Sequence, residues 1–526
     1  MTLRINITQI DSTVGDLKGN IDLIVNSISK TIDLNTRIVL LPFNAITGTP
    51  LGSLLNVKSF TESFHIYLRK LASKLLENNL GGIHVIFISN NFYENPKDKC
   101  LIDICMGKVE FEVIDPCLGY KIFEYEKHKI AICHSSVSKE ILEDSPNIVL
   151  VSSNSEYVID KDFNNKNYYL ALSKKLKATV LKANMAGASD YHIFPGASYV
   201  AVNGHLQAEA LWFDEDNISV LFDDKYVETD QISASRANMQ ISKPEQAYRA
   251  CLTGLNSYMK KNGFKKIIIG LSGGIDSALV ASMAADCIGG KNVYALSLPS
   301  KYSSQHSIDD AKESVKANGF NYDIIDIWPI VESYDQVLEL NGLTEENLQS
   351  RVRANILMAL ANDMNALLVA NGNKSEGAVG YFTMYGDSAG GYAPIRDCYK
   401  TLVWEMAKWR NKLAEEYNQP VPIPLSSINK EPSAELSENQ KDSDSLPQYA
   451  ILDSILENYI DKNLSANQIA DLGYDISTVN SVLKLVKQNE WKRSQYPTGP
   501  RITSTFFGVD RKIPITNRWS EENSGV

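Results

Sequence analysis

One loop of small residues in this chain has the composition and the position to bind a phosphate group. Residues 265–278 read Lys-Lys-Ile-Ile-Ile-Gly-Leu-Ser-Gly-Gly-Ile-Asp-Ser-Ala. The β-branched run is typical of a buried parallel strand, and the Ala-rich stretch from Ala278 favours a helix. A strand, a glycine loop and a helix N-terminus offer an anion backbone N–H groups and a positive dipole end. The alternative is an ordinary strand–turn–helix connection, because paired glycines are common in turns.

The serines and the aspartate of this loop indicate which phosphate chemistry is involved. A Walker A loop would need a Lys that is absent here. The sequence from Ser272 to Ser277 instead resembles the PP-loop of ATP pyrophosphatases, which hold the β,γ-diphosphate of ATP and cleave between the α and β phosphorus atoms. The resemblance implies that ATP binds at Gly270, Leu271, Ser272, Gly273, Gly274, Ile275, Asp276 and Ser277.

A helix expected from Thr344 onward carries a polar stripe. Arg351 and Asn355 are four residues apart and share a face, and Asn347 lies one turn earlier. A guanidinium and two amides on one stripe suit a polar ligand or a carboxylate. The alternative is a solvated helix face.

A strand expected at 366–370 ends in a second polar turn, Asn371 to Glu376. Parallel strands place their carboxyl ends at one edge of the sheet, so this turn should meet the Ser272–Ser277 loop. Magnesium prefers hard oxygen ligands shared with phosphate, so Asp276 and Glu376 are the metal candidates. Lys400 and Ser433 could each reach a phosphate, although alone either would be an ordinary surface residue.

Together these strings resemble NAD synthetases of the glutamine-dependent, two-domain kind. The resemblance covers residues 244–520. The matching runs are Gly-Leu-Ser-Gly-Gly-Ile-Asp-Ser (270–277), Thr-Glu-Glu-Asn-Leu-Gln-Ser-Arg (344–351), Gly-Asn-Lys-Ser-Glu (372–376), Tyr-Gly-Asp (385–387), Pro-Ser-Ala-Glu-Leu (432–436), Lys-Arg-Ser-Gln (492–495) and Pro-Ile-Thr-Asn-Arg-Trp (514–519).

The resemblance implies an enzyme that adenylates the carboxylate of deamido-NAD with ATP and Mg²⁺, releases pyrophosphate, and lets ammonia displace AMP. It implies that Asp276, Ser272 and Lys400 are catalytic and that Asp276 and Glu376 hold Mg²⁺. Asn371, Lys400 and Ser433 would contact ATP. Asn347, Arg351, Glu376 and Lys492 would contact deamido-NAD. Asn371 departs from the family, which usually has Thr there, but an amide can still form a hydrogen bond.

The N-terminal half resembles nitrilase-type amidases, which in complete synthetases release ammonia from glutamine. The resemblance rests on the opening from Gln9 to Asn20, on Thr47-Gly48 with Pro50, on Cys133 after an apolar strand, and on Asn203-Gly204. The family uses a Cys nucleophile, a Glu general base and a Lys that stabilises the oxyanion.

The amidase pattern is incomplete in this chain. The base position is Phe43, which cannot take a proton, and the segment that should carry the Lys is shortened. His134 follows Cys133, but adjacent residues of a strand point to opposite faces. Loss of base and oxyanion partner together predicts a degenerate glutaminase, with free ammonia as nitrogen donor. The alternative is a fully glutamine-dependent enzyme with an unusual amidase site.

Short apolar strands alternate with helical stretches in both halves, which indicates an α/β fold with parallel sheets. We expect an N-terminal nitrilase-like α/β sandwich over 1–230, a linker over 231–243, and a C-terminal doubly wound PP-loop domain over 244–526. The strands expected in the two halves are 3–9, 37–42, 85–89, 130–134, 148–151 and 179–183, then 265–270, 293–298, 323–327 and 366–370. The segment 425–447, rich in Ser, Pro, Glu and Asp, is longer than most connections.

The composition of the chain excludes some classes of binding partner and cellular location. The 526 residues are 44% hydrophobic with a net charge of −11, which argues against nucleic acid as the main partner. No apolar run reaches membrane-spanning length, and the first residues lack the apolar core of a signal peptide. Seven scattered cysteines suggest reduced thiols in a cytoplasm and no zinc site. The degenerate domain would serve as the scaffold of a homo-oligomer.

Two other functions fit part of the pattern. PP-loop enzymes with other acceptors, such as asparagine, argininosuccinate or GMP synthetases, lack the downstream strings in this order. The second is a nucleotide-binding regulator that has lost catalysis, and the intact metal and phosphate positions argue against it.

Overall fold

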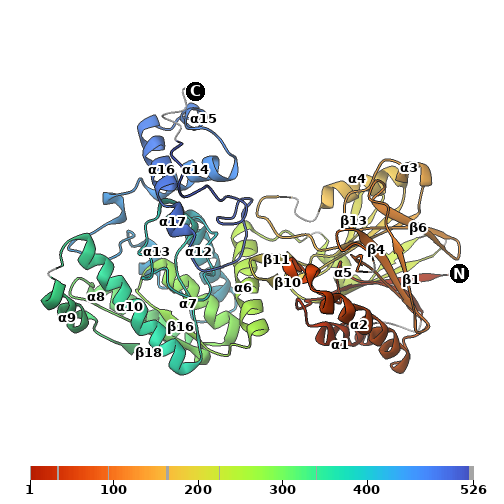
Figure 1. The fold of residues 1–526 in the computed structure, drawn as a ribbon, viewed down its shortest axis with the longest axis horizontal. Coiled ribbons are helices and arrows are strands. Elements are labelled where there is room, and N and C mark those ends of the chain that lie inside the picture. The colour runs from red at the N-terminus through yellow and green to blue at the C-terminus, as the bar shows by residue number, and fades with distance from the viewer. Residues whose placement is uncertain are drawn as a thin grey trace. The chain divides into compact units, whose positions relative to one another are not determined.

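The computed structural model describes residues 2–31, 35–92, 94–161, 165–223, 226–237, 239–338 and 340–519. The chain divides into two compact units, Met1–Ile241 and Ser242–Val526 (Figure 1). The connector expected over 231–243 is partly helical. Helix α5 (Gln231–Arg236) belongs to the first unit, and α6 (Lys243–Asn262) opens the second with Pro244 in its first turn, where proline is well tolerated.

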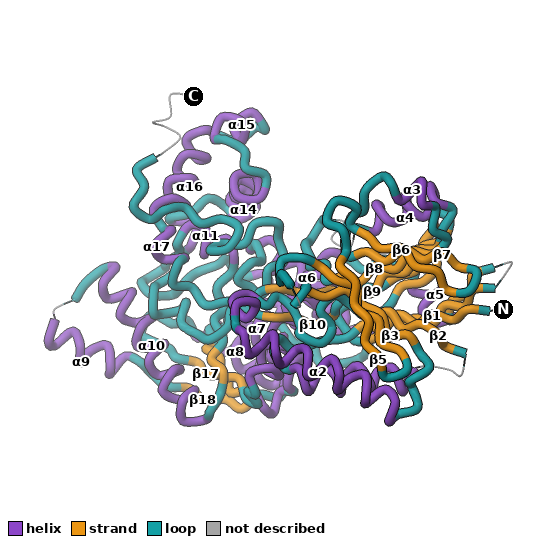
Figure 2. The backbone as a smooth tube through the Cα atoms, turned by 45° about the vertical axis from the view of Figure 1, so that its right-hand side comes forward, coloured by secondary structure: helices purple, strands orange, loops and turns teal. Residues whose placement is uncertain are grey.

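Two sheets face each other in the first unit (Figure 2). In one, the strand order is β15-β14-β1-β2-β3-β4-β5, and in the other β13-β12-β9-β8-β7-β6. The bounds of the first set are Leu3–Gln9 (β1), Thr36–Leu40 (β2), His84–Asn90 (β3), Lys99–Cys105 (β4), Lys108–Val113 (β5), Asp216–Phe222 (β14) and Val227–Thr229 (β15). Those of the second are Tyr120–Tyr125 (β6), His128–Cys133 (β7), Ile148–Ser153 (β8), Thr179–Asn184 (β9), Tyr199–Val202 (β12) and His205–Glu209 (β13). A separate hairpin pairs β10 (Ala186–Ser189) with β11 (His192–Pro195).

Side-chain alternation along the strands divides the core of this unit into layers. Ile130 and Ile132 of β7 pack against the other sheet, whereas Ala131 and Cys133 pack beneath helices. Those helices are α3 (Ile141–Asp144) and α4 (Lys166–Leu176), and α1 (Leu17–Thr31) and α2 (Lys58–Glu77) cover the other sheet. The first unit is therefore the expected α/β sandwich, with helices outside both sheets.

The second unit is built on a parallel sheet in the order β18-β17-β16-β19. Its strands are Ile267–Gly270 (β16), Val293–Ser297 (β17), Asn321–Ile324 (β18) and Leu367–Leu368 (β19). Helix α7 (Ile275–Ile288) is packed between the sheet and α6 and α12 (Lys400–Glu416). Helix α10 (Leu343–Met364) covers the opposite face, where Val352 and Ala361 pack on Ile268. Helices on both faces confirm the doubly wound arrangement.

Further helices surround this sheet. They are α8 (Gln305–Asn318), α9 (Trp328–Leu338), α11 (Lys374–Val379), α13 (Leu425–Asn429), α14 (Tyr449–Leu456), α15 (Ala466–Asp471), α16 (Ile476–Gln488) and α17 (Glu490–Arg493). Helices α14 to α16 form a helical bundle with its own apolar core around Leu452, Ile469 and Val482. Within the described residues, no helix is both long and apolar enough to cross a membrane.

Candidate active site

The loop between β16 and α7 is shaped from within by its own serines. The Ser277 hydroxyl donates to the Gly274 carbonyl at 2.9 Å, and Ser272 Oγ accepts the Gly274 N–H at 3.3 Å. Gly273 has φ +81°, and a Cβ there would lie 2.2 Å from the Ser307 carbonyl oxygen, so only glycine fits. The first N–H groups of α7 have no intrahelical partners. The loop therefore has backbone N–H donors and the positive end of the α7 dipole with which it could bind an anion.

Two carboxylates meet one ammonium beside this loop. Lys400, the first residue of α12, contacts the Asp276 carboxylate, and its Nζ lies 3.3 Å from Glu376 Oε1. Asn373 donates from Nδ2 to Asp276 Oδ1 at 3.0 Å and also caps α11. Asp276, which follows β16, and Glu376, which follows β19, are thus bridged by the Lys400 ammonium at the carboxyl edge of the sheet. The sequence predicts that these two segments meet there.

Burial and charge perturb these groups strongly. Burial raises the pKa of Glu376 to about 8, attraction to Lys400 opposes that rise, and the Asp276 charge adds to it. Burial lowers the pKa of Lys400, but Asp276 and Glu376 outweigh this effect and the pKa lies above its usual value. Burial also raises the pKa of Asp442, which interacts with Lys400 and Asp276. One ammonium therefore faces three carboxyl groups.

This cluster fits a magnesium ion. Asp276 and Glu376 contact the same ammonium, so their oxygen atoms converge, and the surplus of carboxylates favours a second cation. Among the described residues, no group of three or more His, Cys, Asp or Glu side chains is arranged to hold a metal. Magnesium is commonly held by one or two carboxylates together with substrate phosphates, so phosphate oxygens would have to complete this site.

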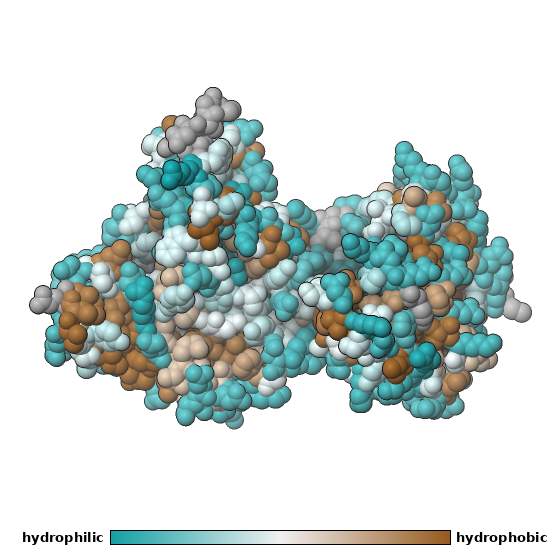
Figure 3. Space-filling model, viewed as in Figure 1, coloured by the Kyte–Doolittle hydropathy of each residue, from teal (hydrophilic) through white to brown (hydrophobic). Residues whose placement is uncertain are grey.

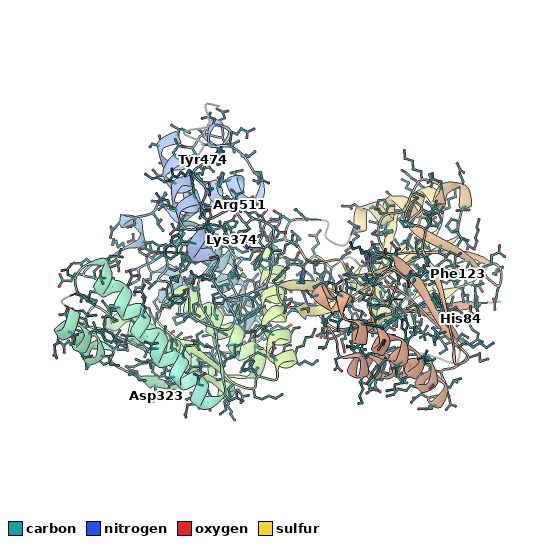
Figure 4. All side chains as sticks on the ribbon, in the orientation of Figure 1. His84, Phe123, Asp323, Lys374, Tyr474 and Arg511 are labelled. Carbon is teal, nitrogen blue, oxygen red and sulfur yellow. The ribbon has the colours of Figure 1, made fainter. Side chains whose placement is uncertain are left out.

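Buried ion pairs and hydrogen bonds from the C-terminal part fix the two helices that carry Glu376 and Lys400. Lys374 lies inside the second unit (Figure 4), where its Nζ donates to the Thr505 carbonyl at 2.9 Å and pairs with Asp397 at 3.1 Å. Asp453 of α14 accepts from the Ser375 hydroxyl at 2.5 Å and from the Thr401 N–H at 2.8 Å. Both contacts lie within two residues of a charged group of the site.

A second polar group surrounds residues 380–387. Thr383 donates its hydroxyl to Asn347 Oδ1 at 2.7 Å, and Arg351 Nε donates to the Met384 carbonyl at 3.3 Å. Lys492 Nζ donates to the carbonyls of Gly380 and Phe382 at 2.8 and 2.9 Å. Three of the four residues expected to contact deamido-NAD therefore border one loop, and the fourth, Glu376, lies in the charged cluster beside Lys400.

The segment after α13 is hydrogen-bonded across the carboxyl edge of the sheet. Glu435 accepts from the hydroxyls of Ser304 and Ser307 at 2.9 and 2.8 Å, next to the N-terminus of α8. Gln349 of α10 donates to the Leu436 carbonyl at 3.0 Å. Ser433 donates to the Gln440 carbonyl at 2.5 Å within the same segment. The Ser433 hydroxyl is thus bonded within its own segment and not to the PP-loop.

In the first unit, Cys133 and Phe43 lie on different faces of the second sheet. The Cys133 thiol is fully buried beneath α4, 3.8 Å from the Tyr169 hydroxyl, and burial raises its pKa to about 12. The His134 ring faces the sandwich interior, with its centroid 4.1 Å from that of Phe43. Burial lowers the pKa of His134 to about 3, so the imidazole is neutral.

Comparison with known proteins identifies the relatives of this architecture. The family model "NAD synthase" matches residues 247–496. A glutamine-dependent NAD(+) synthetase from Acinetobacter baylyi is 34% identical over 546 residues, covering 99% of this chain and 100% of the relative. The synthetase from Rhodobacter capsulatus is 42% identical over 357 residues, covering 65% of this chain and 64% of that protein. The chain belongs to the glutamine-dependent NAD(+) synthetase family. Members of this family are carbon–nitrogen ligases.

Solved structures agree with this assignment. The synthetase from Acinetobacter baumannii, solved with adenosine diphosphate, is 30% identical with a TM-score of 0.74 and covers 99% of both chains. The synthetase from Cytophaga hutchinsonii has a TM-score of 0.80 at 20% identity, covers 98% of both chains, and shows the shared fold. The expected fold class, a nitrilase-like sandwich followed by a PP-loop domain, is confirmed.

Several residues near the synthetase site were not expected from the sequence. Asp442 and Asp453 come from segments far along the chain, and only the fold brings them to Lys400. On α10, Arg351 and Asn355 face outward, whereas Arg353 points to the sheet edge and donates from Nε to the Leu298 carbonyl at 2.8 Å. The apolar spacing of Val352 and Ile356 could have indicated which face of α10 is buried.

Gly273→Ala tests the shape of the phosphate loop. We expect the variant to lose about 2 kcal/mol of unfolding free energy and its ATP affinity, because Cβ would meet the Ser307 backbone. Gly289→Ala is the matched control, since Gly289 has φ +78° but no heavy atom within 4 Å of a Cβ. It should lose about 1 kcal/mol and keep its affinity. Urea unfolding and calorimetric ATP titration measure both, and equal effects of the two changes would contradict the expected clash.

Glu376→Gln tests the buried charge. Because folding raises the pKa of Glu376 from 4.5 to about 8, the folded state binds more protons than the unfolded state between these values. This group's contribution to stability therefore falls as pH rises through that window. Between pH 5 and pH 8 the stability of the variant relative to that of the unmodified protein should therefore rise by about 3 to 4 kcal/mol. Urea unfolding of the ligand-free protein at the two pH values checks this, and a stability difference independent of pH would contradict it.

Proposed function

We propose that the chain makes NAD from ATP, deamido-NAD and ammonia at the PP-loop. The observation that carries the proposal is the convergence of Asp276, Glu376 and Lys400 beside a loop built to bind phosphate. The adenosine diphosphate in the Acinetobacter baumannii synthetase supports ATP as the nucleotide. Asn371 donates to the Gly270 carbonyl at 2.9 Å, while its buried Oδ1 has no partner among the described residues. That oxygen is available to a donor group of the nucleotide.

The residues divide the adenylation between them. The loop from Gly270 to Ser277, with the α7 N-terminus, binds the departing pyrophosphate, and Lys400 balances its developing charge. A carboxylate oxygen of deamido-NAD attacks the α-phosphorus, and the bond from that phosphorus to the bridging oxygen breaks. Magnesium, when bound by Asp276 and Glu376, would neutralise phosphate charge. Ammonia then attacks the acyl carbon, loses a proton, and AMP leaves.

Asn347, Arg351 and Lys492 would hold deamido-NAD against this loop. Their positions around residues 380–387 place amide and cationic groups together, which suits a dinucleotide with phosphates and a carboxylate. Ser433 would reach a phosphate only after its hydrogen bond to Gln440 is broken.

We propose free ammonia as the nitrogen donor because the amidase residues do not converge. A thiolate nucleophile needs a base within hydrogen-bond reach. The base position holds Phe43, stacked on His134, and the Cys133 thiol lies on the opposite face with a pKa near 12. Lys182, the lysine that acts electrostatically on Cys133, donates its ammonium to the Ser155 hydroxyl at 3.0 Å.

The second candidate is a fully glutamine-dependent synthetase. The names of the relatives favour it over the ammonia proposal, since these proteins match nearly the whole chain and are called glutamine-dependent. In that case the first unit would have to bring Cys133 to glutamine by a rearrangement of the β7–α3 segment.

A paired nitrogen-donor assay decides between them. NAD formation and pyrophosphate release are measured with deamido-NAD and ATP, and with either ammonium chloride or glutamine. We expect turnover with ammonium and at least 100-fold less with glutamine, because base and oxyanion partner are both missing. Cys133→Ser should leave ammonium-dependent turnover unchanged.

Glutamine-supported turnover that disappears in Cys133→Ser would contradict the ammonia proposal and establish the second candidate. Binding of ATP and deamido-NAD without pyrophosphate release would instead contradict the synthetase reaction and favour a regulator.

We further propose that the chain assembles as a homo-oligomer. Helix α9 and the start of α10 expose Tyr334, Val337 and Leu343, and Figure 3 shows hydrophobic surface over α9. Apolar surface of this kind often marks a protein contact. Sedimentation velocity should give a mass above that of one chain, and Val337→Glu should lower it. A monomer at micromolar concentration would contradict this proposal.

A further inference from the structure

Arg353 occupies a place in the PP-loop site that has no assigned function. On α10, Leu357 packs on Gly270, the last residue of β16, since a Cβ on Gly270 would lie 3.1 Å from its side chain. Helix α10 runs antiparallel to β16, because its C-terminal end leads directly into β19 at the amino edge of the sheet. Arg353, one turn before Leu357, therefore lies beyond the carboxyl end of β16.

The hydrogen bond of Arg353 fixes the position of its guanidinium more closely. Its Nε donates to the carbonyl of Leu298, the residue that follows β17. The Ser297 hydroxyl, one residue earlier, donates to the Leu271 carbonyl at 3.0 Å. Leu271 opens the PP-loop. The guanidinium is thus anchored at the carboxyl edge between the ends of β16 and β17, next to the loop that binds phosphate.

Among the described residues, no acceptor contacts the outer nitrogens of this guanidinium. In the part of the chain that the structure describes, Arg353 makes one hydrogen bond, from Nε, and no carboxylate oxygen lies within 4.0 Å of its nitrogens. Asp387 and Glu435 act on it electrostatically, yet both are engaged elsewhere, Asp387 with the Thr383 N–H at 2.7 Å and Glu435 with Lys430 at 2.7 Å. Burial lowers the pKa of Arg353 to about 10. Arg353 remains partly exposed, so a ligand can reach these nitrogens from solvent.

The surroundings of Arg353 favour an anionic ligand. Gln349, one turn earlier on α10, is fully buried and bonds the segment that contains Glu435. Arg353 is bonded to the residue after β17, whereas Lys400 and Asp276 meet Glu376, which follows β19. An anion held by the PP-loop would therefore meet a cation on each side.

We propose that Arg353 binds a phosphate of the bound nucleotide through the two outer nitrogens of its guanidinium. A planar fork of N–H donors matches the geometry of phosphate oxygens. ATP at its α-phosphate and deamido-NAD at its pyrophosphate bridge both offer this chemistry. The assignment rests on the proposed function for its choice of ligands.

Equilibrium binding to the full chain tests the proposal without turnover. Arg353→Gln and Arg353→Lys are titrated calorimetrically with ATP and, separately, with deamido-NAD, each with Mg²⁺. Arg249→Gln is the control, because Arg249 lies exposed on α6 and pairs with Glu245 one turn away. We expect Arg353→Gln to weaken the affinity for one ligand by about 10- to 100-fold, as for a lost charged hydrogen bond. Arg353→Lys should lose less, because the charge is kept without the fork.

The ligand whose affinity falls identifies the source of the phosphate. Unchanged affinity for both ligands in both variants overturns the proposal, and so does an equal loss in Arg249→Gln. If Arg353→Gln does not fold, Arg353→Lys decides alone, and unchanged affinity in it overturns the proposal. Because ATP binding is measured directly, failure of the chain to make NAD would leave this result interpretable.

Discussion

The contact of Lys400 with Asp276 and Glu376 is the interaction on which the second unit depends. A carboxylate excluded from water is costly without a partner, and two side by side are more costly still. Lys400 compensates both, which requires that α7, α11 and α12 begin at the same place. The sheet order β17-β16-β19 provides this, because parallel strands deliver all their following helices to one edge. The carboxylate oxygens are then available to a metal ion, and the ammonium and the α7 N-terminus to a phosphate.

In the first unit, the alternation of side chains along β7 places Cys133 and His134 on opposite faces of the sheet. Strand β7 sends Ile130 and Ile132 into the sandwich and Ala131 and Cys133 under α4. Because the period is two, His134 returns to the inner face and packs on Phe43. The Cys133 thiol therefore packs beneath α4, and the rings of His134 and Phe43 pack against each other inside the sandwich.

Much of the architecture is predictable because it depends on local pattern. The strands at 3–9 and 148–151 fall where apolar runs predict them, and Ser272–Asp276 follows a β-branched strand as expected. Antiparallel strands such as β5, with exposed Glu110 and Phe111, lack that signal and were not predicted. The gathering of Asn347, Arg351 and Lys492 was expected only through family resemblance. Arg353 and Asp453 required the packing itself, since helix rotation and long-range hydrogen bonds are not visible in spacing.

The network around Lys374 has a consequence for how the protein is made. Its partners include Thr503 and Thr505, which lie near the end of the chain, while Lys374 stands two residues before Glu376. During synthesis the PP-loop leaves the ribosome more than two hundred residues before those threonines do. A nascent chain therefore carries the phosphate loop long before the contacts that align its acidic partner exist. The timing of translation itself would therefore delay the assembly of this site until residues 503–505 have been made.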